Sequence, residues 1–254
     1  MDTIGLIAAM SSESNALLRQ LQGGKRIAAG SFRGVRFQIA QRDCVLVTSG
    51  MGVRRAAAAA RVLIETLHPA CLLSFGIAGA LREDLKIGDV ILATHNCTLE
   101  KGRLGPFQLL ATLSGAARET VEQALRPRGA RFLLGTSVTT RGSQLVLQPP
   151  QGLLNPVLEM ETAGILPVAE ESGIPLVVLR SVSDGPLAPL PFDLGTVMDE
   201  DYNLQPGRLL LAVLKHPRLL LQSGRMLKNS RIAADNAAIA VAAVLGQLLP
   251  LISN

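Results

Sequence analysis

The chain has 254 residues, of which 48% are hydrophobic and 18% are charged, and its formal net charge is +5. These values describe a folded, rather apolar protein with a sizeable core, and they exclude a disordered chain. Aromatic residues make up only 3%, with no Trp and one Tyr, which argues against a stacking surface for single-stranded nucleic acid. We therefore expect no nucleic-acid partner.

The cysteines and the termini indicate the compartment. The three cysteines, Cys44, Cys71 and Cys97, each lie in or beside an apolar run. Their odd number and spacing predict buried free thiols in a reducing compartment and no metal site. No cationic segment precedes the first apolar run, and the apolar run 237–252 is interrupted by Gln247 and Pro250. It falls short of the ~20 residues that a spanning helix needs. We expect a cytoplasmic protein.

Apolar, β-rich runs alternate with helical patterns along the chain. Strands are predicted at 4–9, 35–40, 44–48, 71–75, 90–94, 132–136 and 176–179, the second and third forming a hairpin. Helices are predicted at 11–21, 54–68, 115–125 and 162–172. This alternation predicts one α/β domain over residues 1–254, with a central mixed, largely parallel twisted sheet flanked by helices.

Two glycine-rich segments follow predicted strands. Ser49-Gly50-Met51-Gly52 precedes a helix, and Gly76-Ile77-Ala78-Gly79 follows the next strand. Glycines at such positions let backbone amides approach an anion, although many are only tight turns. Arg54 and Arg55, just beyond the first segment, are candidate phosphate contacts, and a solvated helix start explains them equally well.

Acidic side chains mark two further positions. Glu159-Met160-Glu161 precedes the helix at 162–172, and Ser183-Asp184 ends an apolar run. Ligands of open α/β sheets bind outside the carboxyl ends of the strands, and two carboxylates there can divide acid and electrostatic roles. Glu159 and Glu161 are two residues apart, so they point to different sides and at most one should face a ligand.

Each acid also has a structural explanation. Glu13 lies in the first turn of the helix at 11–21, where a carboxylate complements the helix dipole, and spacing alone favours that role. Asp184 fits a turn or a cap equally well. The three histidines pair with no nucleophile and no Gly-x-Ser-x-Gly motif is present, so Ser-His hydrolase chemistry is not expected.

Taken together, these segments resemble the nucleoside phosphorylase and nucleosidase superfamily, over nearly the whole chain to about Asp184. The opening run 4–10 with Glu13 looks like the start of the methylthioadenosine/S-adenosylhomocysteine nucleosidases. The segments at 49–52, 76–79 and 85–89 match that family's central loops, and Glu159-Met160-Glu161 with Ser183-Asp184 matches its most specific pair.

The resemblance implies a role for each site residue. Asp184 would protonate or hydrogen-bond the purine N7, Glu161 would hold the ribose hydroxyls above Met160, and Glu13 would position the attacking water. The remaining expected substrate contacts are Glu159, Gly76, Ile77, Ala78, Gly79, Ser49, Gly50 and Ser183. The resemblance implies no cofactor, it leaves phosphate open as a co-substrate in place of water, and we expect a homodimer.

Two departures from the nucleosidase pattern indicate a particular branch of the superfamily. Ile77 stands where the nucleosidases carry Ser, and the region after Asp184 diverges, with several prolines and the Met198-Asp199-Glu200-Asp201 turn. These features resemble the hopanoid-associated phosphorylases, a branch to which removal of adenine from adenosylhopane is attributed. Two alternatives stay open. One is a soluble methylthioadenosine/S-adenosylhomocysteine nucleosidase, and the other is a non-catalytic nucleoside- or lipid-binding protein.

Residues 203–231 form a basic and apolar segment. Leucines alternate there with six cations, Arg208, Lys215, Arg218, Arg225, Lys228 and Arg231. Such a segment can lie in an anionic membrane interface, so we expect peripheral binding at the inner face of the membrane. An oligomer or core helix with a solvated basic face is the alternative. Pro206 and Pro217 predict two short helices, suited to a lid.

Overall fold

The structure is a computed structural model that describes residues 3–21, 23–140, 152–186, 218–247 and 252. Within these ranges the helices are α1 (Ser11–Gln20), α2 (Val53–Leu67), α3 (Gly115–Leu125), α4 (Thr162–Glu171) and α7 (Arg218–Leu245). The strands are β1 (Thr3–Ala8), β2 (Lys25–Ala29), β3 (Phe32–Ile39), β4 (Arg42–Thr48), β5 (Cys71–Ala80), β6 (Val90–Glu100), β7 (Arg103–Leu104), β8 (Gln108–Leu109), β9 (Phe132–Thr140), β10 (Pro156–Glu159) and β11 (Leu176–Asp184).

The strands form one mixed sheet in the order β10-β9-β6-β11-β5-β1-β4-β3-β2, and β7 and β8 pair with β6. The neighbours β4, β1, β5 and β11 are parallel, whereas β11 meets β6 in antiparallel pairing. Because β10 also pairs with β5, five strands close into a ring at one end of the sheet. The mixed sheet with flanking helices confirms the predicted fold class.

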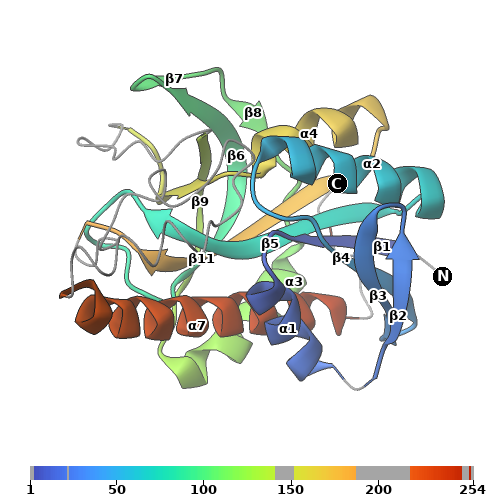
Figure 1. Ribbon diagram of the computed structural model, residues 1–254, viewed down its shortest axis with the longest axis horizontal. Helices are drawn as coiled ribbons and strands as arrows, with labels where there is room; N and C mark the ends of the chain where they lie inside the picture. Colours follow the sequence, from blue (N-terminus) through green and yellow to red (C-terminus); the bar gives the residue numbers. More distant parts are fainter. Residues whose placement is uncertain (1–2, 22, 141–151, 187–217, 248–251, 253–254) are drawn as a thin grey trace.

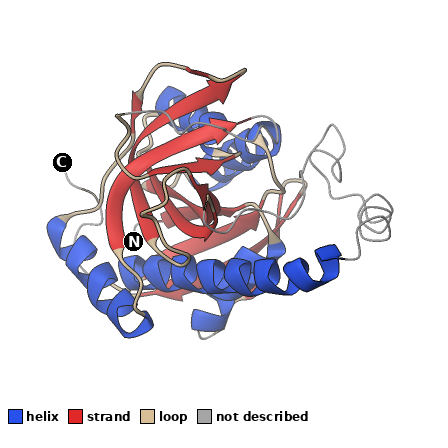
Figure 2. Ribbon diagram, turned by 90° about the vertical axis from the view of Figure 1, so that its left-hand side faces the viewer, coloured by secondary structure: helices blue, strands red, loops and turns tan. Residues whose placement is uncertain are grey.

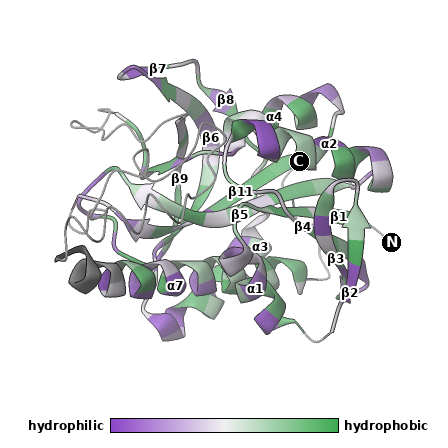
Figure 3. Cartoon of the chain, viewed as in Figure 1, coloured by the Kyte–Doolittle hydropathy of each residue, from purple (hydrophilic) through white to green (hydrophobic). Residues whose placement is uncertain are grey.

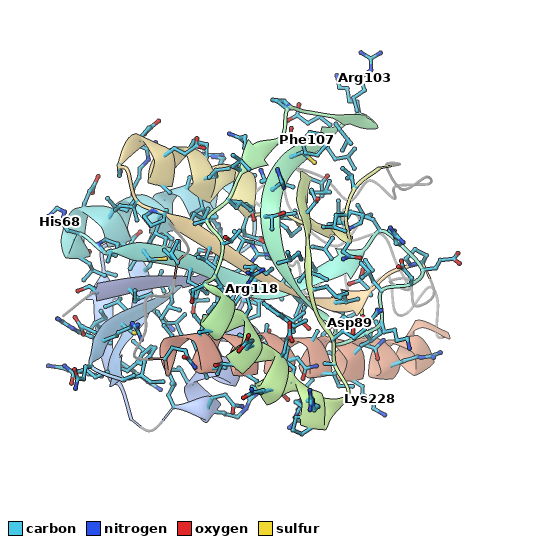
Figure 4. The ribbon with its side chains drawn as sticks, turned by 180° about the vertical axis from the view of Figure 1, so that it is seen from behind. His68, Asp89, Arg103, Phe107, Arg118 and Lys228 are labelled. Atoms are coloured by element: carbon cyan, nitrogen blue, oxygen red, sulfur yellow. The ribbon has the colours of Figure 1, made fainter. Side chains whose placement is uncertain are left out.

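Helices cover both faces of the sheet (Figure 1). The core on one side joins apolar residues of α1, α3 and α7 to the strands, and the core on the other side joins residues of α2 and α4. Hydrophilic and hydrophobic residues alternate along α1 and α7 (Figure 3). At the margin of the sheet, β7 and β8 extend from β6, and Arg103 and Phe107 stand well away from the body there (Figure 4).

Two sequence predictions are wrong. Residues 76–79 are not a loop beyond the strand, because they lie inside β5 and pair with β11 up to Gly79. The segment after Pro217 is not a short helix either, because α7 runs without a break from Arg218 to Leu245 (Figure 2). Its second half is rich in small apolar residues that are buried against the sheet, so the core holds the helix together. The rest of the predicted insert, residues 203–217, lies outside the described residues.

The three cysteines are free and buried, as predicted. Burial raises the pKa of the Cys44 and Cys71 thiols to about 12 and that of Cys97 to about 11, so all three stay protonated near neutrality. Among the described helices, none has the length and apolar character needed to cross a membrane.

Candidate active site

Glu13 lies in the first turn of α1, directly after β1. Its Oε2 accepts a hydrogen bond from the Met10 amide at 2.8 Å, which closes that first turn. Its Oε1 accepts a second bond from the Ile77 amide of β5 at 2.9 Å. The side chain is buried, and this burial raises its pKa against the opposing effect of the two amides. Stabilising the helix end therefore accounts for only one of the two carboxylate oxygens.

Glycines on β5 make room for two acids. A Cβ on Gly76 would approach Glu13 Oε1 to 2.4 Å, and a Cβ on Gly79 would approach Asp184 Oδ2 to 2.9 Å. Side chains larger than hydrogen are excluded at both positions unless the carboxylates move. Gly76 and Gly79 are three positions apart, so the two contact points lie roughly 10 Å apart along the strand.

Asp184 is the last residue of β11, at the end that the sequence predicted. The pairing with β5 shifts by one residue between Val182 and Asp184, a β-bulge of the kind that re-aims a side chain. The Ser183 hydroxyl donates to Asp184 Oδ1 at 2.5 Å. Burial raises the pKa of Asp184, and this hydrogen bond offsets only part of the rise. The protonated form is thus favoured more than in a free aspartate.

Glu161 stands where α4 begins, beside the start of α2. Its Oε1 accepts a hydrogen bond from the Gly52 amide at 3.1 Å, at the positive end of α2. The two helices touch closely, since a Cβ on Gly164 would lie 2.1 Å from the Val53 carbonyl oxygen. Burial raises the pKa of Glu161 to about 7, with a further contribution from the neighbouring Glu159. Its charge therefore changes near neutral pH.

Glu159 points into the protein. Its Oε2 accepts hydrogen bonds from Arg180 Nη2 at 2.9 Å and from the amides of Glu161 and Thr162, while the Thr139 hydroxyl bonds Oε1. Its side chain has no exposed surface. The expected substrate contact by Glu159 stays a prediction. Met160, between the two acids, is half-buried.

Arg180 is a site residue that the sequence reasoning missed. It is a fully buried arginine on β11, and its Nη2 lies 2.9 Å from Glu159 and 4.0 Å from Glu161 Oε2. The same nitrogen donates to the Ser74 hydroxyl at 3.0 Å. The available signal was a single cation inside the apolar run 176–182, because an arginine there needs a buried anion.

The turn at 49–52 is confirmed as the link between β4 and α2. The amides of Ser49 and Gly50 donate to the carbonyls of Ala8, the last residue of β1, and of Ala9, so the segments after β4 and β1 lie together. The Arg55 guanidinium covers Gly50, where a Cβ would meet Nη1 at 2.7 Å, and Arg54 is exposed. Phosphate binding by the two arginines stays a prediction.

These contacts bring Glu13, Glu161 and Asp184 to the carboxyl ends of parallel neighbours in the sheet. The positive charge of Arg180 lowers the pKa of both Glu13 and Glu161 and so opposes part of the effect of their burial. Several buried acids with raised pKa values beside one cation are typical of acid–base chemistry rather than of a structural core. Among the described residues, no cluster of three His, Cys, Asp or Glu side chains could hold a metal ion.

Comparisons with known proteins agree with this arrangement. A family model described as the phosphorylase superfamily matches residues 3–215. The 5′-methylthioadenosine/S-adenosylhomocysteine nucleosidase of Shewanella halifaxensis is 27% identical over 236 residues, which cover 84% of this chain and 98% of that protein. The enzyme of the same description from Shewanella sp. strain W3-18-1 is 28% identical over 234 residues, covering 84% and 99%.

Solved structures share the fold. The nucleosidase of the same description from Neisseria meningitidis, in complex with methylthio-immucillin-A, has a TM-score of 0.68 at 22% identity and covers 97% of this chain and 99% of its own. That from Colwellia psychrerythraea, in complex with adenine, has a TM-score of 0.71 at 20% identity, covering 97% and 96%. The futalosine hydrolase of Helicobacter pylori has a TM-score of 0.68 at 17% identity, covering 95% and 96%. The family match over most of the chain, together with this fold and site, shows that the protein belongs to the phosphorylase superfamily and is an enzyme of the nucleosidase and nucleoside phosphorylase kind.

Proposed function

We propose that this enzyme cleaves the N-glycosidic bond of a 5′-substituted adenosine and releases adenine. The observation that carries the proposal is the trio of buried acids, Glu13, Glu161 and Asp184, held by backbone amides and glycine contacts at one edge of the sheet. The nucleosidase relatives described above support the same reaction class.

Asp184 is the proposed general acid. Adenine is a poor leaving group as an anion, so proton delivery to N7 lowers the barrier, typically by ~10²–10⁴-fold in rate. Burial favours the protonated carboxyl. Because Oδ1 already accepts the Ser183 hydroxyl, the proton is expected on Oδ2, the oxygen that lies against Gly79. As the C1′–N9 bond breaks, its electron pair enters the purine and this proton neutralises it.

Glu161 is the proposed contact for the ribose hydroxyls, with Met160 beneath the sugar. An ionised carboxylate at that position stabilises the positive charge that develops on the ribose as the bond breaks. The Gly52 amide, at the start of α2, donates a hydrogen bond to one of its oxygens at 3.1 Å. This bond fixes the orientation of the carboxylate. Its pKa of about 7 keeps a large fraction ionised at neutral pH.

Glu13 is the proposed base for the nucleophile. Each of its oxygens accepts one backbone amide and keeps a further acceptor site for water. Its raised pKa makes the carboxylate a better proton acceptor than a free glutamate. Water would add to C1′ and lose its proton to Glu13, giving adenine and the 5-substituted ribose. Phosphate is the alternative nucleophile, for which Arg54 and Arg55 are the candidate contacts.

We propose adenosylhopane as the 5′-substituted adenosine. The resemblance of Ile77 and of the region after Asp184 to the hopanoid-associated phosphorylases supports this choice. A polycyclic lipid stays in the bilayer, so the enzyme would work as a peripheral protein at the membrane surface. On α7, Arg225, Lys228 and Arg231 are exposed, and Leu227 among them is 64% exposed. Cations around an apolar side chain suit an anionic interface.

A methylthioadenosine/S-adenosylhomocysteine nucleosidase is the second candidate, favoured by the names of the sequence relatives. Incubating the purified protein with adenosylhopane, methylthioadenosine and S-adenosylhomocysteine, with and without phosphate, separates the candidates. We expect free adenine from adenosylhopane, and the mass of the sugar product identifies the nucleophile. Release from methylthioadenosine alone would overturn the hopanoid assignment. Tight binding of these compounds without any adenine release would favour the alternative of a non-catalytic nucleoside- or lipid-binding protein.

A further inference from the structure

Glu159 has no place in the chemistry above, yet it is the most extensively bonded acid of the site. Arg180, Thr139 and Thr162 all donate side-chain hydrogen bonds to its carboxylate. Arg180 is fixed in turn by the Ser74 hydroxyl. A buried acid with this many partners costs much desolvation, so its position needs an explanation beyond a turn in the chain.

The first explanation is geometric. Glu159 Oε2 accepts the amide hydrogens of Glu161 at 3.0 Å and Thr162 at 2.9 Å, which are among the amides left without partners where α4 begins. These bonds fix the backbone of the residue whose side chain is the proposed ribose contact. Strand β10 holds Glu159 itself, in register with Thr139 of β9.

The second explanation is electrostatic. The charged groups that face Glu161 are Glu159 from β10, Arg180 from β11 and Glu13 from α1. Arg180 Nη2 is 2.9 Å from Glu159 but 4.0 Å from Glu161, so its charge compensates mainly the former. The pKa shifts agree, because Arg180 and the hydrogen bonds outweigh burial at Glu159 and lower its pKa, whereas that of Glu161 is raised.

We propose that Glu159 is a positioning residue that acts through Glu161: it fixes the turn from which Glu161 projects, and it holds Arg180 away from the Glu161 carboxylate. With Glu159 in place, Glu161 keeps an uncompensated carboxylate for the ribose. Without the charge of Glu159, the Arg180 guanidinium would turn to Glu161 and bind it. This inference rests on the proposed function for its catalytic consequence, but not for its electrostatic one.

The test is Glu159→Gln, with Glu170→Gln, at an exposed position on α4, as the matched control. Carbon-13 NMR titration of the side-chain carboxyls, with Glu161 assigned from a Glu161→Gln sample, reports its charge without turnover. We expect the Glu161 midpoint to fall by about one pH unit or more, because a like charge is lost and a cation is gained. The acid limb of kcat/KM should move to lower pH with it, and kcat should fall roughly 10- to 100-fold.

Glu159→Asp separates the two effects, since it keeps the charge and shortens the reach. Its Glu161 midpoint should stay near that of the wild type while kcat falls. A folded Glu159→Gln protein with an unmoved midpoint would overturn the proposal. If that variant does not fold, Thr139→Val removes a neutral donor to Glu159 and should lower kcat, and an unchanged kcat would likewise overturn it. Absence of adenine release by the wild type would refute the proposed function but not the role of Glu159, because the titration needs no substrate.

Discussion

Gly76 lies against Glu13 so closely that a Cβ on residue 76 would come within 2.4 Å of Glu13 Oε1. The same oxygen accepts the amide hydrogen of the next residue, Ile77, at 2.9 Å. Strand β5 thus both leaves space for the acid and binds it. A glycine that the sequence placed in a loop is required here, within a strand, for the close approach of a side chain.

Gly76→Ala should therefore displace the Glu13 carboxylate and impair catalysis with little effect on folding. The end of a glutamate side chain can move away from a methyl group, but the Ile77 hydrogen bond would be lost. We expect kcat/KM to fall by roughly 10²-fold, as a misplacement of about 1 Å commonly causes. Gly115→Ala, at a helical position where a Cβ meets no atom within 4 Å, is the control and should be neutral. Equal activity of the two variants would contradict a role for Glu13.

Asp184→Asn should lower kcat and kcat/KM by the same factor, of roughly 10²–10⁴. Asparagine keeps the shape and the hydrogen-bonding capacity of the side chain, but it has no proton to deliver. Steady-state kinetics of adenine release measures the effect. Asp84→Asn is the control, because Asp84 is surface-exposed and paired with Arg82. A wild-type kcat in Asp184→Asn would mean that this residue is structural.

Glu161 should make folding stability fall as pH rises through neutrality. Its pKa is raised from 4.5 to about 7 in the folded state, so the folded protein binds a proton that the unfolded chain releases in this interval. The contribution of Glu161 to the free energy of unfolding is fully present below pH ~4.5 and is lost by pH ~8. The total change is up to about 3 kcal/mol. Urea unfolding of wild type and Glu161→Gln from pH 5 to 8 measures this. The variant should gain stability relative to the wild type with rising pH, and a constant difference would refute the shift.

Binding to anionic liposomes should depend on the exposed cations of α7. Each cation near such a surface contributes up to about 1 kcal/mol, and less as salt screens it. Charge reversal at Arg225 and Lys228 should weaken co-sedimentation with the vesicles at low salt. Adenine release from a short, soluble adenosine analogue should stay nearly unchanged in the same variant. Failure of the wild type to bind at low salt would favour an oligomer contact or a solvated basic face for this part of the helix.

Local sequence patterns predicted the regular elements well. Helix α3 begins and ends at Gly115 and Leu125 as predicted, and the hairpin at 35–40 and 44–48 appears as β3 and β4. Hydrophobic periodicity acts over a few residues, so it can be read locally. The continuation of β5 past residue 75 could not be predicted from the local pattern, because its partner strand β11 lies about a hundred residues further along the chain. The short strands β2, β7, β8 and β10 were also missed, although β2 and β7 pair with strands that are their immediate neighbours along the chain.

The sequence by itself predicted the acids of the candidate site, because the resemblance to the superfamily rests on Glu159-Met160-Glu161, Ser183-Asp184 and Glu13. Only the tertiary structure decided the burial and the charged partners of each acid. Arg180, 21 residues beyond Glu159, binds that acid and leaves Glu161 at the start of α2. The physical reason is that charge and orientation depend on burial and on partners brought together by folding, and a pattern of neighbouring residues contains neither.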